Sequence, residues 1–336
     1  MMSGGLFRRK KGKVLRTEVL GLHWDVELPF VFCVHHRDMY PRGNAQQAPP
    51  LNTIAGRNLG HDYRERYGFR MYHGKVVPGF PMHPHCGTET VTVLEKGWID
   101  HFDTFGGEGR YGAGDVHWLM TGKGIQHCEM YPLVNQDSDN PFEMFQIWID
   151  LPREGKGKDP FFRMMWAPEV SVCSGEGWSA RVVAGSFGGV RSSMEVPDCS
   201  WAADAGSGLS MVLLELEKGG RVLLPEGQEG MNRNIYVYEG GGVLADGVDI
   251  PSGTRAKLDG TADIELEGGN GGCRLLLLEG VPVPQRTASY GPFYMNSDRE
   301  VREALAEFRR TGFGEWGWGV VDKVHPRDAG RFERHP

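Results

Sequence analysis

The sequence has little that would place it in a membrane, in a disulfide-bonded secreted domain or on nucleic acid. Its longest unbroken run of leucine, isoleucine and valine covers only residues 275–278, far below the roughly 20 apolar residues that span a bilayer. The first residues lack the apolar segment of a secretory signal. The six cysteines are scattered without a CxxC pair, which predicts reduced thiols. We therefore expect a cytoplasmic protein that does not act at a membrane.

The chain also lacks a net positive charge, apart from one basic run near its N-terminus. A formal net charge of -7 argues against nucleic acid as a direct partner, since phosphate binding requires a basic surface. The basic run precedes the first acidic residue and consists of Arg8, Arg9, Lys10, Lys11, Lys13 and Arg16. Such a run is typical of a solvated, flexible tail, which we expect over residues 1–16. Import into the nucleus, or contact with an anionic surface, is the alternative.

Glycine and proline are abundant, and the hydrophobic stretches between them are short. The 336 residues include 49 Gly and 20 Pro, and β-branched or alternating segments such as 90–94 and 145–149 lie between turn residues. This pattern predicts an all-β sandwich or barrel. It occurs in two blocks, 17–152 and 161–290, separated by a charged linker that contains glycine, and therefore predicts two barrels. Residues 40–70 show no clear period, so we expect a long loop there.

One helix is predicted near the C-terminus, within a final region that covers residues 291–336. Ser297 can cap its N-terminus, Glu300 can complete a capping box, and Gly312 can end the helix. Apolar residues recur between these limits at spacings of three and four. Beyond the helix we expect an irregular tail.

Histidine is distributed very unevenly. Ten of the twelve histidines lie between His23 and His127, and none lies between Cys128 and Val324. Two barrel-like blocks with histidine in only the first predict one domain that can bind a metal and one that cannot.

Two motifs in the first block have the spacing of metal ligands. His83 and His85 are followed by Glu89, and His127 is followed by Glu129 further along the chain. Residues i and i+2 of a strand share a face, so each pair can reach one point. Three imidazoles and one carboxylate suit a divalent transition metal, and a four-ligand shell leaves positions open for reaction. The motifs therefore predict one reactive metal centre.

The same segments resemble the pirin family of cupin proteins. The family pattern HPHRGFETVTYLLEG is matched by HPHCGTETVTVLEKG at residues 83–97, and GDVQWMTAGRGIxHSE by GDVHWLMTGKGIQHCE at residues 114–129. FQIWIDLP at 145–152 and the segment at 291–314 also resemble family sequences. The resemblance implies a bicupin, with two cupin-type β-barrels (double-stranded β-helices) and the metal in the N-terminal one.

The resemblance also implies which residues form the site. The family binds iron through three histidines and one glutamate, which correspond here to His83, His85, His127 and Glu129. Glu89 is the alternative fourth ligand, because the general cupin pattern uses the glutamate after HxH. With Glu129 as the ligand, we expect Glu89, His101 and His117 to support the ligands without binding the metal.

Four positions beside the ligands depart from the family pattern, namely Cys86, Thr88, His117 and Cys128. These changes are expected to alter the polarity of the pocket while sparing the metal. Cys86 and Cys128 fall on the strand faces opposite the ligands, which favours packed, unreactive thiols. Redox sensing by these thiols is the alternative.

The resemblance implies two kinds of function. Some pirins have quercetin 2,3-dioxygenase activity, which would make this chain an Fe(II)-dependent dioxygenase that acts with O₂ on flavonol-like or enolisable aromatic substrates. Glu129 would then be the base that accepts the substrate proton. Other pirins are redox-sensitive transcription cofactors, which would make the chain a non-catalytic regulator of a protein partner. Both predict one Fe(II) per chain, with Zn, Cu, Ni or Mn able to take its place.

Overall fold

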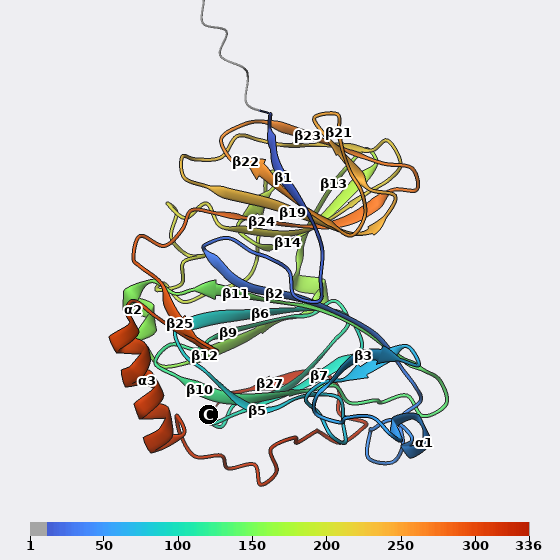
Figure 1. Ribbon diagram of the computed structural model, residues 1–336, viewed down its shortest axis with the longest axis vertical. Helices are drawn as coiled ribbons and strands as arrows, with labels where there is room; N and C mark the ends of the chain where they lie inside the picture. Colours follow the sequence, from blue (N-terminus) through green and yellow to red (C-terminus); the bar gives the residue numbers. More distant parts are fainter. Residues whose placement is uncertain (1–11, 336) are drawn as a thin grey trace, which may run out of the picture.

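Two β-barrels, stacked one above the other, form the molecule (Figure 1). The computed structural model describes residues 12–335, so most of the predicted basic tail lies outside the described residues. The lower barrel in the figure is N-terminal and the upper one is C-terminal. The all-β bicupin fold predicted from the sequence is confirmed, as is the helix near the C-terminus.

The N-terminal barrel consists of two five-stranded antiparallel sheets. The first contains, in spatial order, β12 (Phe161–Met165), β9 (Val116–Met120), β6 (Thr88–Lys96), β11 (Asn140–Asp150) and β2 (Phe30–Tyr40). The second contains β27 (Phe332–Arg334), β8 (Glu108–Gly112), β7 (Trp98–Asp103), β10 (Ile125–Met130) and β5 (Gly79–His85).

The C-terminal barrel pairs a seven-stranded sheet with a four-stranded one. The larger sheet contains β1 (Val14–Val19), β22 (Thr254–Asp259), β19 (Asn232–Gly240), β24 (Cys273–Gly280), β17 (Ser210–Leu216), β14 (Trp178–Ala184) and β13 (Ser171–Gly175). The smaller contains β18 (Arg221–Leu224), β23 (Ile264–Gly268), β20 (Val243–Ala245) and β21 (Val248–Ile250).

Short hairpins and helices complete the chain. The hairpins are β3 (Asp62–Arg66) with β4 (Phe69–Met71), β15 (Ser186–Phe187) with β16 (Val190–Arg191), and β25 (Ala288–Tyr290) with β26 (Phe293–Met295). The helices are α1 (Leu51–Ile54), α2 (Arg153–Lys156), the 3₁₀ turn η1 (Ala167–Glu169) and α3 (Asp298–Thr311). In the described part of the chain, none of these helices has the length and apolar character needed to cross a bilayer.

Three strands pair with sheets other than those that the predicted domain boundaries imply. β1 overlaps the end of the predicted tail 1–16 and the start of the predicted domain 17–152, yet it pairs with β22 of the C-terminal barrel. β12 falls in the predicted domain 161–290 but pairs with β9 of the N-terminal barrel. β27 lies in the predicted irregular tail and pairs with β8. Alternation along a sequence predicts a strand, but it does not say which sheet edge the strand will cover.

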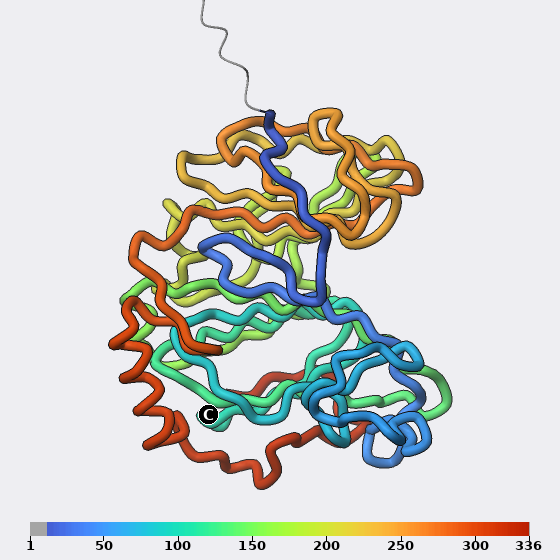
Figure 2. Tube along the Cα trace, viewed as in Figure 1, coloured from blue at the N-terminus to red at the C-terminus, as the bar shows by residue number. Residues whose placement is uncertain are grey.

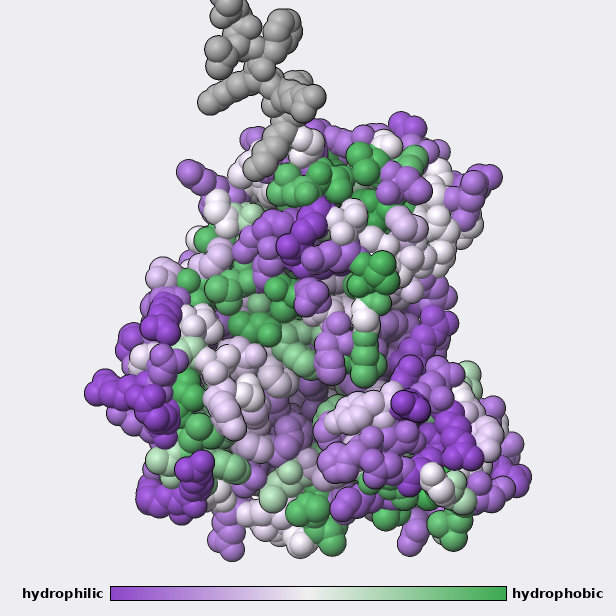
Figure 3. All heavy atoms as spheres, viewed as in Figure 1, coloured by the Kyte–Doolittle hydropathy of each residue, from purple (hydrophilic) through white to green (hydrophobic). Residues whose placement is uncertain are grey.

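The expected loop at residues 40–70 is wrong in part, because it contains α1 and the β3–β4 hairpin. Tyr67 and Gly68 both have positive φ, as the tight turn of a two-residue hairpin requires. The guanidinium of Arg57 lies 2.9 Å from a carboxylate oxygen of Asp62 and 4.0 Å from the ring centre of Phe69. These contacts connect the segment after α1 to the β3–β4 hairpin, and together they form a small lobe. Elements of three to five residues are too short for a period to be recognised. The face of the lobe seen in Figure 3 is mostly hydrophilic.

The two barrels share one apolar core, in which β6 and β11 of one barrel face β17 and β24 of the other. Val91 and Phe145 of one barrel and Leu276 of the other belong to this core, and all three are fully buried. The indole of Trp24 stacks on Tyr236, with ring centres 5.2 Å apart. Burying one such side chain contributes about 1.5–3 kcal/mol. The alternate residues of β6 therefore point the other way, into the N-terminal barrel.

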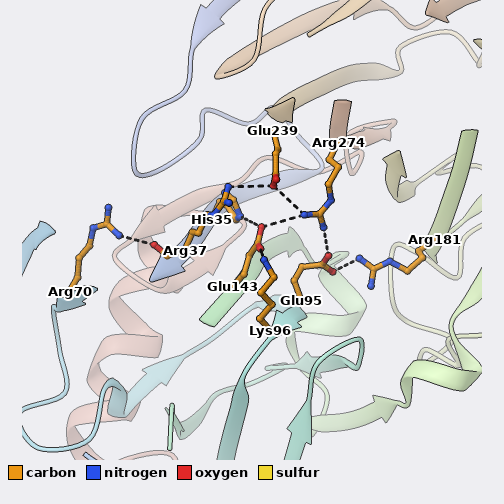
Figure 4. Close-up of polar contacts among 9 residues, drawn as sticks. All are labelled: His35, Arg37, Arg70, Glu95, Lys96, Glu143, Arg181, Glu239 and Arg274. Carbon is orange, nitrogen blue, oxygen red and sulfur yellow. Dashed lines mark hydrogen bonds and ion pairs between the residues drawn. The ribbon is translucent and has the colours of Figure 1, made fainter. Parts of the chain in front are cut away.

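A polar network beside this core connects the same two sheets (Figure 4). Arg274 lies 2.5 Å from Glu95 and 3.8 Å from Glu143, both of which belong to the N-terminal barrel. Glu143 also accepts hydrogen bonds from Lys96 at 2.8 Å and from His35 at 3.2 Å. Burial by itself would raise the Glu143 pKa, but the hydrogen bonds from His35 and Lys96 outweigh it and lower the pKa to about 2.

The predicted caps of α3 are confirmed, with one difference in the capping box. The Ser297 hydroxyl accepts from the Glu300 amide at 3.3 Å, and Gly312 ends the helix at φ 61°. The Glu300 carboxylate accepts from the amide of Asn296, one residue before the cap. After α3 the chain runs beneath the N-terminal barrel (Figure 2), where Arg110 donates to the carbonyls of residues 325–327 and 329. The C-terminal segment therefore closes the outer face of the barrel.

Candidate metal centre

Two neighbouring strands of the N-terminal barrel bring the predicted histidines together. β5 pairs antiparallel with β10, and His83 lies directly opposite His127 in the register. His85 shares the inward face of β5 with His83, two residues away. The predicted same-face arrangement of the two motifs is therefore found in the structure for the three histidines.

The three imidazoles converge on one point. One nitrogen from each of His83, His85 and His127 lies within 4.8 Å of the others, and their ring centres are 4.5–5.0 Å apart. His83 Nδ1 lies 2.9 Å from the carbonyl oxygen of Pro81 and donates to it, which leaves its Nε2 free. Both ring nitrogens of His85 and His127 are buried without a hydrogen-bond partner among the described residues.

Burial also keeps these imidazoles neutral. It lowers the pKa of His83 to about 4, although the hydrogen bond to Pro81 partly offsets the effect. Burial lowers the pKa values of His85 and His127 well below the usual value. A buried, unpaired nitrogen is costly, whereas three neutral imidazole nitrogens that face one point are the donor set that divalent transition metals prefer. The site therefore fits such a metal.

Glu129 lies beside this cluster. Its Oε2 is 3.9 Å from His127 Nε2, and its two oxygens accept hydrogen bonds from Thr92 at 3.2 Å and from Gln146 at 2.7 Å. Burial raises the pKa of Glu129, and the hydrogen bonds from Gln146 and Thr92, with the charge of His101, act against this rise. Its role as the fourth ligand stays a prediction.

Glu89 was expected either to support the ligands or to be the alternative fourth ligand, but its hydrogen bonds lie away from the histidine cluster. It occupies the outer face of β6 and accepts hydrogen bonds from Trp118 at 2.9 Å and from Ser200 at 2.7 Å. Burial raises its pKa to about 7 despite these two hydrogen bonds. Gly87 explains the change of face, since it forms a turn at φ 81° and a Cβ there would meet the Tyr294 carbonyl oxygen. Neither of Glu89's hydrogen bonds reaches the histidine cluster.

His101 and His117 form a second row behind the ligands. The His101 ring lies 5.5 Å from that of His127, and its Nε2 is 3.0 Å from a carboxylate oxygen of Asp103. His117 contacts His101 at 4.7 Å between ring centres and stacks on Tyr111 at 5.2 Å. The His101 ring thus contacts that of His127, while His117 lies one residue further away; that either histidine supports a metal ligand stays a prediction.

Both cysteines beside the ligands are buried on the opposite strand faces. Cys128 packs with Phe102 against the C-terminal segment, and Cys86 packs with Phe293 and α3. Burial raises the pKa of Cys86 to about 12 and that of Cys128 well above its usual value. The predicted packing of these thiols is confirmed.

A cavity of about 300 Å³ opens onto His83 and His85. Its walls include the aromatic rings of Phe32, Phe80 and Trp148. The Trp148 ring meets that of His85 edge-on, with centres 4.8 Å apart. Other lining residues are polar, and the sequence prediction did not identify them: His23, His36, Tyr63, Tyr72, His73 and Gln146. Gln146 could have been found from the alternation of β11, which places an amide on an inward face.

Two family models match the chain in agreement with this arrangement. The pirin model matches residues 57–149, and the model of the pirin C-terminal cupin domain matches residues 211–314. The chain belongs to the pirin family. A Pseudomonas aeruginosa protein with the provisional name quercetin 2,3-dioxygenase is 32% identical over 69% of this chain and 79% of its own length. Rat pirin is 28% identical over 73% of this chain and 81% of its own length.

Solved structures agree with the fold of a pirin. A crystal structure of quercetin 2,3-dioxygenase from Acinetobacter baumannii superposes with a TM-score of 0.70 at 23% identity, covering 90% of this chain and 98% of that one. A second structure with the same name and source gives a TM-score of 0.68 at 18% identity, covering 96% and 99%. At this level of identity the likeness shows that the two-barrel architecture is shared.

Proposed function

We propose that this pirin binds one iron ion through His83, His85, His127 and Glu129, and uses it to oxidise flavonol-like or other enolisable aromatic compounds with O₂. The observation that carries the proposal is the convergence of imidazole nitrogens from His83, His85 and His127, with His83 and His85 also lining a cavity that has aromatic rings in its wall. The name of the Pseudomonas aeruginosa relative supports the reaction class.

The metal and the aromatic residues of the cavity would have different roles. A redox-active divalent metal held by these residues would supply Lewis acidity and the redox chemistry that a reaction with O₂ requires. Trp148 and Phe32, whose ring centres lie 4.4 Å apart and whose planes are tilted by 32°, form an aromatic wall against which an aromatic ring can pack. Because most of the lining is apolar, a bound aromatic ring would displace water from this wall.

Glu129 is the candidate base. Its carboxylate is held beside the histidine cluster by hydrogen bonds from Thr92 and Gln146, so it can accept the proton of a substrate hydroxyl that reaches the cluster with little reorganisation. Gln146 lines the cavity itself, and its Oε1 accepts from the Trp148 indole at 3.1 Å. The hydrogen bond from Trp148 therefore sets which end of the amide faces Glu129.

Oxygen uptake tests the proposal. Anaerobically Fe(II)-loaded protein is mixed with O₂ and a panel of flavonols and enolisable aromatic compounds, alongside a His85→Ala variant treated in the same way. We expect substrate-dependent uptake by the wild type and loss of that uptake in the variant. Equal uptake by both proteins on every compound would mean adventitious iron chemistry. That result would favour the alternative role of a redox-sensitive regulator.

A further inference from the structure

A chain of buried polar groups forms one wall of the cavity away from the metal cluster. The His36 imidazole is 4% exposed, lines the cavity and makes a short hydrogen bond through Nδ1 to the hydroxyl of Tyr72. The same hydroxyl lies 3.3 Å from Oδ2 of Asp38, and Oδ1 of Asp38 is ion-paired with Arg70 at 3.0 Å. β2 supplies His36 and Asp38 from one face, two residues apart.

The hydrogen bonds among these polar groups determine which ring nitrogen of His36 has no partner. An ionised Asp38, paired with Arg70, can only accept, so the Tyr72 hydroxyl donates to it. His36 Nδ1 then donates to the Tyr72 oxygen, and Nε2 keeps a lone pair. That Nε2 has no hydrogen-bond partner among the described residues. Burial lowers the pKa of His36 to about 3, so the ring is neutral near pH 7 and Nε2 is an acceptor.

A purely structural role explains this arrangement poorly. A buried acceptor without a partner costs about 1–3 kcal/mol, and an apolar side chain would pack against Phe80 and Tyr131, the ring neighbours of His36, without that cost. The imidazole instead borders the cavity, on a side that Tyr63, Tyr72 and His73 also line, and the Phe80 ring contacts both it and His83. An acceptor in that position suits a ligand group that can donate.

We propose that His36 Nε2 accepts a hydrogen bond from a hydroxyl that lies on the substrate at a distance from the oxygen atoms facing the metal centre. The inference rests on the proposed function and narrows its substrate class. Preferred substrates are aromatic compounds with one enolisable oxygen for the histidine cluster and a second hydroxyl on a remote ring position. Tyr72 and Asp38 are positioning residues, because they act only through His36.

Binding without turnover tests this inference. Fe(II)-loaded protein is titrated under argon, by calorimetry, with quercetin and with 3-hydroxyflavone, which shares the scaffold but lacks the remote hydroxyls. In a His36→Phe variant we expect quercetin to bind about tenfold more weakly, as for one lost hydrogen bond, and 3-hydroxyflavone to change by less than about twofold. His36→Gln can place an amide oxygen near Nε2 and should restore much of the preference. Tyr72→Phe frees the His36 ring and should weaken quercetin binding selectively, by a smaller factor.

The outcomes separate the two proposals. Equal weakening of both ligands, unchanged binding of quercetin in His36→Phe and Tyr72→Phe, or no binding of either ligand to the wild type would overturn the role of His36. If His36→Phe does not fold, the selectivity of His36→Gln and Tyr72→Phe decides the matter. A His36-dependent preference in a protein that consumes no O₂ with any compound would uphold the binding site and refute the dioxygenase.

Discussion

Exchanging each of two buried glutamates for glutamine should separate the proposed fourth metal ligand, Glu129, from Glu89, whose hydrogen bonds point elsewhere. Glu129 and Glu89 are both almost fully buried, and each accepts two hydrogen bonds. In Glu129→Gln the amide oxygen can face the Gln146 side-chain amide, and its NH₂ can donate to the Thr92 hydroxyl. In Glu89→Gln the oxygen can keep the bond from the Trp118 indole, while the Ser200 hydroxyl rotates to accept.

The size of each effect follows from this geometry. Because the hydrogen bonds can be kept in both variants, the free energy of unfolding of the metal-free proteins should change by no more than about 1 kcal/mol. Glu129→Gln removes the one negative charge beside the three imidazoles. We expect metal affinity to fall by at least about 100-fold, or about 2.7 kcal/mol. This loss equals or exceeds the largest loss usual for a residue that only hydrogen-bonds to a ligand, which is about 100-fold. Glu89→Gln should leave metal affinity within about threefold, since its hydrogen bonds point away from the cluster.

Competition with a coloured chelator measures the metal affinities, and urea unfolding of the chelated proteins measures stability. The two variants control for each other, since both remove a buried carboxylate. A Glu89→Gln protein that loses its metal while Glu129→Gln keeps it would show that the fourth ligand is wrongly assigned. Equal losses in both would show that burial of charge, and not coordination, governs the affinity.

Three further changes test the surroundings of the site and the junction of the barrels. Gln146→Leu removes the donor to Glu129, and chelator competition should show metal affinity about tenfold lower. The Glu143 pKa of about 2 lies below the ordinary carboxylate value, so its ionised form stabilises the fold above about pH 4.5 and that contribution is lost as pH falls towards 2. The free energy of unfolding measured with urea should therefore decrease more steeply between about pH 4.5 and pH 2 in the wild type than in Glu143→Gln. Arg274→Met leaves Glu95 with one cationic partner fewer and should cost about 1–3 kcal/mol of unfolding free energy; an unchanged midpoint would show that the network contributes little.

The sequence predicted the shared face of His83 and His85 because that geometry is local and follows from the two-residue period of one strand. The ends of α3 were predictable for a similar reason, since Ser297 and Gly312 act on adjacent backbone groups. Such features depend on the chain within a few residues of themselves. The adjacency of His127, which lies on the neighbouring strand 42 residues after His85, is a tertiary contact that the resemblance to the pirin pattern implied.

Other features depend on contacts that no local pattern records. Glu89 was expected to bind or support the metal centre but faces away from the histidines, because the turn at Gly87 separates β5 from β6 and their alternation does not continue from one to the other. The cavity wall joins His36 to Tyr72, which lies 36 residues further along the chain. β1 and β27 cover edges of sheets that are distant in sequence. Pairing of this kind is decided by tertiary packing.

Anomalous diffraction from crystals of the iron-loaded protein tests the central claim most directly. The account predicts one strong iron peak per chain, within bonding distance of nitrogens of His83, His85 and His127 and of a Glu129 oxygen. A peak that lacks Glu129 but retains the histidines would correct the fourth ligand alone. An iron peak elsewhere in the chain, or a second tightly bound iron in the C-terminal barrel, would contradict the account.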